Sequence, residues 1–191
     1  MIKKLNISFL LTVILTGNAL SDEINFKNIA KSPDFVPFGD VFPEPSQKPY
    51  ECIGFKTNNE CDDYFHVIRN NDQILKVGIL RLRENDGALI KAAITGKIIN
   101  GYLCANYGKG LLSTSNKKTG ESGSQALINV LRPSFAKFGT VCSAYFSDVN
   151  GYRIEHFNKH GKVEADFLPK LVRFQAETPK LYSLFESGRK S

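Results

Sequence analysis

The sequence predicts an α+β fold: a mainly antiparallel β-sheet with two or three short helices, stabilised by disulfide bonds. Short runs rich in Val, Ile, Phe and Tyr recur between turns built from Gly, Asn and Asp, which is typical of an antiparallel meander. Four cysteines follow an export leader, and an even cysteine count in an exported chain indicates disulfides. Two segments in the second half carry signals for the start of a helix.

The first 21 residues have the features of a cleaved signal peptide. Lys3 and Lys4 form a positive n-region, an apolar stretch runs from Ile7 to Leu15, and small residues end the segment. The apolar run is shorter than the roughly 20 residues of a spanning helix. We therefore expect an exported protein, periplasmic or secreted, without a transmembrane segment in the mature chain. The two lysines, and a mature part without an Asn-x-Ser/Thr acceptor, favour a bacterial source.

Residues 22–49 are predicted to form a proline-rich N-terminal arm ahead of a single globular domain at 50–191. Five of the eight prolines lie in 33–49, and proline fixes φ and removes a backbone donor. This stretch should therefore be neither helix nor central strand. It also contains three phenylalanines and two valines, so we expect an extended arm packed along the domain. A disordered linker or a polyproline ligand is the alternative.

The first predicted strands form a hairpin. Residues 73–84 alternate, with Leu75, Val77 and Ile79 on one face before the phase changes to Leu80 and Leu82. Asn85-Asp86-Gly87 supplies a tight turn. Two further strands, 88–94 and 97–104, can continue the meander across Thr95-Gly96. A helix over 88–99 competes, because its alanines favour helix while Gly96 and two isoleucines oppose it.

The second half of the chain follows a polar, glycine-containing loop at 113–125. Ser124 can cap a helix over 126–131, which Pro133 would perturb. Pro179 can start a last short helix. Three more strands are predicted between turns rich in Asn, Gly and Lys: 140–147, 152–158 and 163–168.

The cysteines permit three pairings, of which we favour Cys52–Cys61 and Cys104–Cys142. The first closes a short polar loop, and the second joins two segments with similar tyrosine-containing surroundings. Cys61, Asp62, Asp63 and His66 could begin a zinc site, but no pattern supplies the remaining ligands. We predict structural disulfides, no metal and no cofactor.

Charge is unevenly distributed along the chain. Residues 87–147 hold seven basic side chains and a single acidic one, Glu121. Such a segment can present a basic face to an anionic envelope polymer or an acidic protein. Nucleic acid is a poor candidate, because the chain lacks Arg-rich or aromatic-basic repeats. The candidate binding residues are Lys91, Lys97, Lys109, Lys117, Lys118, Arg132 and Lys137.

These observations favour an exported, non-catalytic binding or inhibitor module. No catalytic motif is complete, so an exported hydrolase would need an unfamiliar site near His66 and His156. A third hypothesis is a subunit of a cell-surface assembly that docks through the proline-rich arm. Whether the chain is an enzyme stays open at this level.

Overall fold

The computed structural model describes residues 26, 32–44, 46–56, 59–81, 88–116, 125–165 and 167–181. The expected signal peptide, residues 1–21, lies outside the described residues. No helix in the described part of the chain combines the length and the apolar character needed to cross a membrane.

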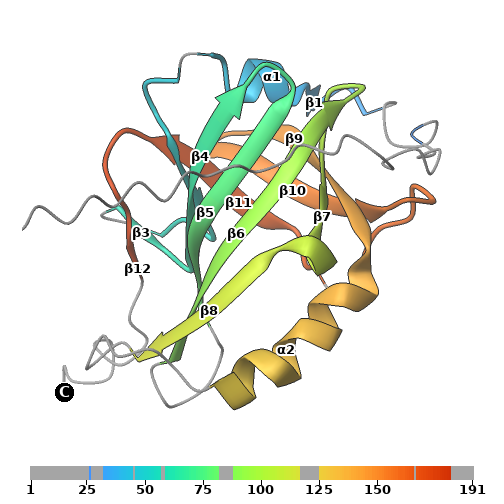
Figure 1. Cartoon of the computed structure of the whole chain (residues 1–191). Coiled ribbons are helices and arrows are strands. Elements are labelled where there is room, and N and C mark those ends of the chain that lie inside the picture. Colours follow the sequence, from blue (N-terminus) through green and yellow to red (C-terminus); the bar gives the residue numbers. More distant parts are fainter. Residues whose placement is uncertain are drawn as a thin grey trace, which may run out of the picture.

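Eight antiparallel strands form a closed barrel (Figure 1). Each strand pairs with the next around the ring, and the pairing of the last barrel strand in the chain with the first closes it. In order around the barrel the strands are β2 (Tyr50–Ile53), β4 (Asp63–Asn70), β5 (Gln73–Arg81), β6 (Ala88–Ile99), β7 (Tyr102–Asn106), β9 (Thr140–Asp148), β10 (Gly151–Asn158) and β11 (Lys170–Gln175).

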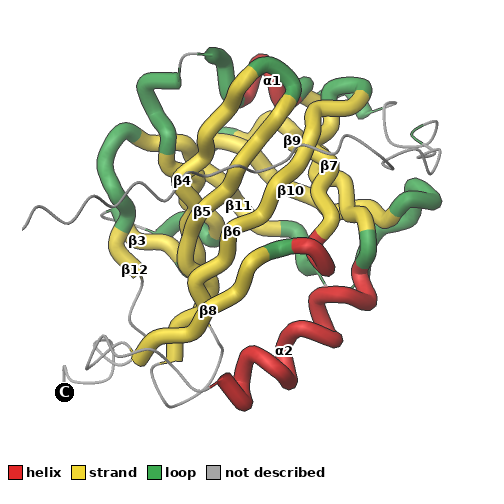
Figure 2. The backbone as a smooth tube through the Cα atoms, viewed as in Figure 1, coloured by secondary structure: helices red, strands yellow, loops and turns green. Residues whose placement is uncertain are grey.

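The remaining elements extend or cover this barrel (Figure 2). One short strand adds to β9, one strand adds to the first half of β6, and two short strands form a separate parallel pair. Within the described ranges, two of the three helices are single turns. These elements are β1 (Phe35–Val36), α1 (Phe38–Val41), β3 (Glu60–Cys61), η1 (Tyr107–Lys109), β8 (Leu111–Asn116), α2 (Gln125–Phe138) and β12 (Lys180–Leu181).

The predicted α+β class is therefore wrong. The chain is a closed β-barrel, and α2, at 14 residues, is the one helix longer than a single turn among the described residues. The class was missed because β2 with β11 and β7 with β9 close the ring, and these strands lie far apart in the sequence. Local alternation predicts strands, whereas only distant pairing distinguishes a barrel from an open sheet.

The predicted turn at Thr95-Gly96 is also wrong, as is the competing helix over 88–99. One continuous strand, β6, runs through both, and the chain turns at Asn100-Gly101. Both turn residues have positive φ, 52° and 85°, which a two-residue hairpin turn requires and which Asn and Gly tolerate best. Gly96 serves a different purpose: a Cβ there would lie 2.8 Å from the carbonyl oxygen of Cys104. Its glycine allows close approach of two strands.

Several other local expectations need correction. Part of the predicted loop at 113–125 belongs to β8, Gln125 begins α2, and residues 117–124 lie outside the described residues. The segment 163–168 contributes a single bridge, between Val163 and Phe157, in place of a strand. Where a helix is expected after Pro179, the structure has the strand β12, and the residues after Leu181 are not described. The turn at 85–87 likewise lies outside the described residues, although β5 and β6 do pair antiparallel.

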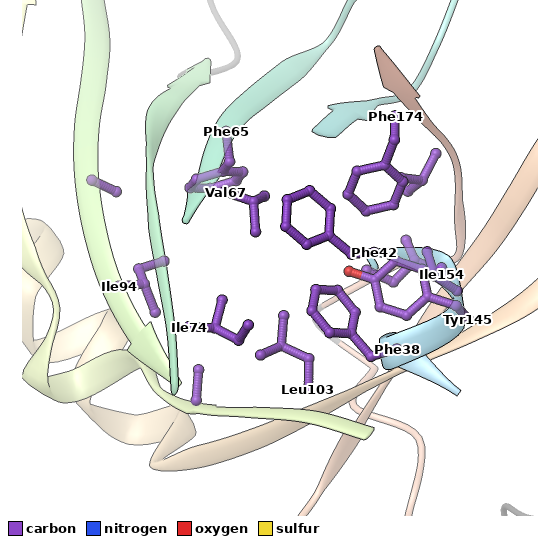
Figure 3. Packing of buried hydrophobic residues seen from close by; sticks show 14 residues of the cluster. Phe38, Phe42, Phe65, Val67, Ile74, Ile94, Leu103, Tyr145, Ile154 and Phe174 are labelled. Atoms are coloured by element: carbon purple, nitrogen blue, oxygen red, sulfur yellow. The ribbon is translucent and has the colours of Figure 1, made fainter. Parts of the chain in front are cut away.

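The proline-rich stretch contains the one-turn helix α1, so the prediction that it excludes a helix is wrong. The stretch also supplies part of the core. Pro37 stands immediately before α1, where a missing N–H costs nothing. Phe38 is fully buried and Phe42 nearly so. Figure 3 shows both rings inside one end of the barrel, beside Tyr145 and Phe174. α1 therefore plugs that end of the barrel.

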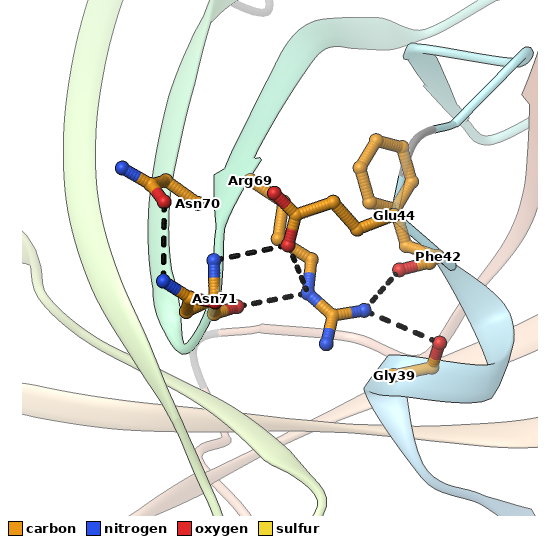
Figure 4. Close-up of polar contacts among 6 residues, drawn as sticks. All are labelled: Gly39, Phe42, Glu44, Arg69, Asn70 and Asn71. Carbon is orange, nitrogen blue, oxygen red and sulfur yellow. Dashed lines mark hydrogen bonds and ion pairs between the residues drawn. The ribbon is translucent and has the colours of Figure 1, made fainter.

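Arg69 fixes this plug to the barrel wall (Figure 4). Its Nη1 donates hydrogen bonds to the carbonyl oxygens of Gly39 and Phe42, at 3.3 and 2.6 Å. Its Nε donates to the carbonyl of Asn71, at 2.9 Å, and Glu44 accepts from the Asn71 N–H at 3.0 Å. The guanidinium thus satisfies carbonyls at the end of α1 that the one-turn helix leaves without partners.

Candidate functional site

Two disulfides are present, and both are the pairings that the sequence favours: Cys52–Cys61 and Cys104–Cys142. All four cysteines are fully buried. Cys104 and Cys142 are direct register partners in the β7–β9 pair that closes the barrel. Their bonding is consistent with an oxidising, exported environment.

A charged cluster lies inside the barrel, where the sequence predicts only apolar residues. The carboxylate of Glu51 on β2 is fully buried, and the ammonium of Lys76 on β5 forms an ion pair with it. The hydroxyl of Tyr145 donates a hydrogen bond to the same carboxylate at 2.6 Å. Burial raises the pKa of Tyr145 well above its ordinary value, and the Glu51 carboxylate raises it further. The cluster is therefore a neutral phenol beside one ion pair in the barrel interior.

A second polar group lies on the opposite wall. Ser143 Oγ and His156 Nδ1 are 3.0 Å apart, and the ring of Phe167 lies over His156 with centroids 5.0 Å apart. Burial, followed by the positive charges of Lys76 and Lys170, lowers the pKa of His156 to about 3. The imidazole is consequently neutral at pH 7.

A hydroxyl beside an imidazole is the distance pattern of a nucleophile and its base. A histidine with so low a pKa is a weak base, however. Phe167 also packs against Tyr107 and Phe138, and these three rings cover the barrel beside His156. Lys170 pairs with Asp63 at 2.9 Å. No group of three or more His, Cys, Asp or Glu side chains within the described ranges could hold a metal ion.

The two histidines singled out for a hydrolase do not meet. His66 lies between the buried Phe65 and Val67 on β4, so its side chain points outward, where it packs against Tyr50. His156 faces the barrel interior with Ser143. Asp62 and Asp63 also point to different sides of the chain. Asp62 forms an ion pair with Lys56, whereas Asp63 forms one with Lys170.

A shallow surface pocket lies next to His66, between β4 and the residues that follow α1. Phe42, Glu44 and Pro49 form part of its lining, together with Arg69. The guanidinium of Arg69 is already occupied by the carbonyls of α1, so the pocket offers no free cation to a ligand.

The predicted binding residues fall on neighbouring elements. Lys91 is exposed on the outer face of β6 opposite Ser113 of β8, and Lys109 ends η1 just before β8. Arg132 and Lys137 are exposed on α2, which packs against both η1 and β8. Lys97 lies six residues from Lys91 along β6, a distance of about 20 Å at the usual rise of a strand. Lys117 and Lys118 lie outside the described residues.

Strand β5 has the opposite sidedness to the one its sequence indicates. Its apolar residues Leu75, Val77 and Ile79 point outward, whereas Lys76 points into the barrel beside Glu51. Sequence reasoning missed the interior ion pair for this reason. The available clue was that Ile74 and Gly78 share a face with Lys76. In the structure, a Cβ at residue 78 would lie 2.1 Å from the carbonyl oxygen of Tyr64, so this position requires glycine.

Comparison of the chain with known protein families, with characterised proteins and with solved structures finds no match.

Proposed function

We propose that this protein is an exported, non-catalytic binding module that engages an anionic partner through the face formed by β6, η1, β8 and α2. One observation carries the proposal. These four elements pack on one another and their described sequences contain basic residues but no acidic one. The charge segregation of the sequence thereby becomes a segregation of surface, which favours a partner of negative charge.

The hydrolase alternative has less support. It needs an unfamiliar site near His66 or His156, and the barrel wall separates these two side chains. The Ser143–His156 pair could act alone only if Phe167 moved away and if the pKa of His156 rose toward neutrality.

The test is binding of the exported, processed protein to an immobilised anionic polymer, such as heparin, over increasing salt. The variant Lys109→Glu/Arg132→Glu should weaken binding at least tenfold, and wild-type binding should weaken steeply with ionic strength. The matched control is Lys48→Glu/Lys180→Glu, which makes the same charge change at exposed lysines of other elements. Equal losses in both variants, or binding that salt leaves unchanged, would contradict the proposal.

A further inference from the structure

The outer surface of the barrel carries an apolar row that crosses five strands. Each member is the direct register partner of the next, so the side chains stand side by side across β2, β4, β5, β6 and β8. Strands spaced about 4.8 Å apart give this row a width of about 19 Å. We call it the outer apolar row: Tyr50, His66, Val77, Ala93 and Leu111.

Two members of the row are exposed, the other three are half-buried, and the row has apolar neighbours. Val77 is 44% exposed and Leu111 is 72% exposed. Ile68, which is 46% exposed, lies beside Leu75 in the next outward row of β4 and β5. Large apolar side chains gathered on one surface, with nothing over them in the described part of the chain, mark a site of interaction. Figure 1 shows this wall of the barrel, with β4, β5, β6 and β8, toward the viewer.

The outer sides of two other strands are different. Phe26 and Phe35 cover the outer side of β7 by stacking on Tyr102, with centroids 4.5 and 4.8 Å away. The outer side of β10 carries an ion pair between Arg153 and Glu155. These two strands carry stacked rings or charge on their outer sides, whereas the wall that contains the outer apolar row carries exposed apolar side chains.

Positive charge borders the row at its β6 and β8 end. Lys91 and Lys97 flank the Ala93 position on the same outer face of β6, and Lys109 precedes Leu111 by two residues. None of the outward positions described on β4, β5, β6 and β8 is acidic. An apolar centre with lysines beside it matches the two layers of an anionic bilayer surface, where headgroups carry charge and acyl chains begin beneath them.

We propose that this wall is a membrane-docking surface for bilayers containing anionic phospholipid. The inference rests on the proposed function, whose anionic partner it identifies as a lipid headgroup layer. Val77 and Leu111 enter the interface, His66 and Tyr50 lie at headgroup depth, and the lysines of β6 and η1 contact phosphates. A soluble polyanion would use the lysines and leave the apolar row without a role.

The experiment is co-sedimentation of the exported, processed protein with phosphatidylcholine vesicles that contain 0 or about 30% phosphatidylglycerol, a range chosen because electrostatic attraction scales with anionic lipid content. Binding should appear with the anionic vesicles and decrease with salt. Val77→Ser/Leu111→Ser should reduce vesicle binding at least tenfold and leave heparin binding unchanged. The matched control is Val149→Ser/Leu168→Ser, which removes two apolar side chains that are 98% and 63% exposed elsewhere.

The outcomes separate the two proposals. Binding to heparin without binding to anionic vesicles overturns the membrane inference and retains the anionic-partner proposal. Binding to neither overturns both. Equal losses of vesicle binding in Val77→Ser/Leu111→Ser and in the control pair would also overturn the membrane role. So would a wild-type dimer, measured by sedimentation velocity, that becomes a monomer in Val77→Ser/Leu111→Ser. Circular dichroism of each variant establishes that the barrel is intact.

Discussion

Glu51 and Lys76 place opposite charges beside the large aromatic and aliphatic cluster that fills most of the barrel interior. Removing two charges from water is costly, and their attraction offsets that cost only when each charge keeps its partner. Tyr145 contributes a hydrogen bond to the carboxylate, and the Lys76 ammonium lies 5.1 Å from the ring of Phe65. Each member therefore depends on the presence of the others.

Lys76→Met should destabilise the protein by about 3–5 kcal/mol, because it leaves the Glu51 carboxylate buried without its counter-ion. The double variant Glu51→Gln/Lys76→Met should recover most of this loss, since a glutamine carbonyl still accepts the hydrogen bond of Tyr145. Denaturant unfolding of the wild type, the single variants and the double variant gives the coupling energy. Additive losses across this cycle would show that the pair contributes no mutual stabilisation.

His156 should make the stability fall as the pH falls from about 6.5 to about 3. The unfolded histidine takes up a proton near its ordinary pKa of 6.5, whereas the folded one stays neutral until about 3. The unfolded state therefore binds more protons throughout that interval, and the loss approaches about 1.4 kcal/mol per pH unit. Above pH 6.5 this contribution is complete.

The measurement is the free energy of unfolding against pH for the wild type, His156→Asn and, as control, His160→Asn in an exposed turn. The other titratable groups are common to the wild type and His156→Asn. The difference between wild type and His156→Asn should therefore isolate the histidine. Parallel curves for those two proteins would contradict the assigned pKa.

At the scale of elements, alternation located several strands well but did not determine which face each strand buries. The observed β9 and β10 differ from the predicted 140–147 and 152–158 by one residue at one end. On β5 the sequence indicates Leu75, Val77 and Ile79 as the buried set, yet these face outward. Side chains alternate with period two, so the strand is identified either way, and only its neighbours determine its inward face.

The helix α1 shows a different limit of sequence reasoning. Proline statistics argue against helix in 33–49, but a helix can begin directly after a proline. What holds α1 is the guanidinium of Arg69, which lies 27 residues from Phe42 and donates to its carbonyl. A contact of that separation has no local sequence pattern.

Phe38→Ala should cost about 3–5 kcal/mol, because the ring is fully buried between Phe42 and Tyr145 at the plugged end of the barrel. Thermal or denaturant unfolding measures the loss. Val149→Ala, at a side chain 98% exposed, is the control and should leave stability nearly unchanged. A loss below 1 kcal/mol for Phe38→Ala would show that residues before 50 are dispensable to the core.

At the scale of the molecule, closure of the barrel is the feature that the sequence could not reveal. The β7–β9 pair joins Cys104 to Cys142 across a sequence separation of 38, and no local rule selects that partner over another strand. The sequence did favour the disulfide between Cys104 and Cys142. It did not predict that the two strands carrying these cysteines pair with each other. The outer apolar row depends on the same closure, since register across five strands brings its members together.

The two disulfides should therefore contribute unequally to the stability of the whole barrel. Cys104–Cys142 spans 38 residues and Cys52–Cys61 spans 9, which in the chain-entropy model corresponds to about 4 and about 2.5 kcal/mol. Cys104→Ala/Cys142→Ala should accordingly lower the free energy of unfolding more than Cys52→Ala/Cys61→Ala. Both pairs are fully buried, and alanine leaves no unpaired hydroxyl in either site. The reverse order in denaturant unfolding would show that the short loop at β2 and β3, and not the β7–β9 closure, limits the stability of the barrel.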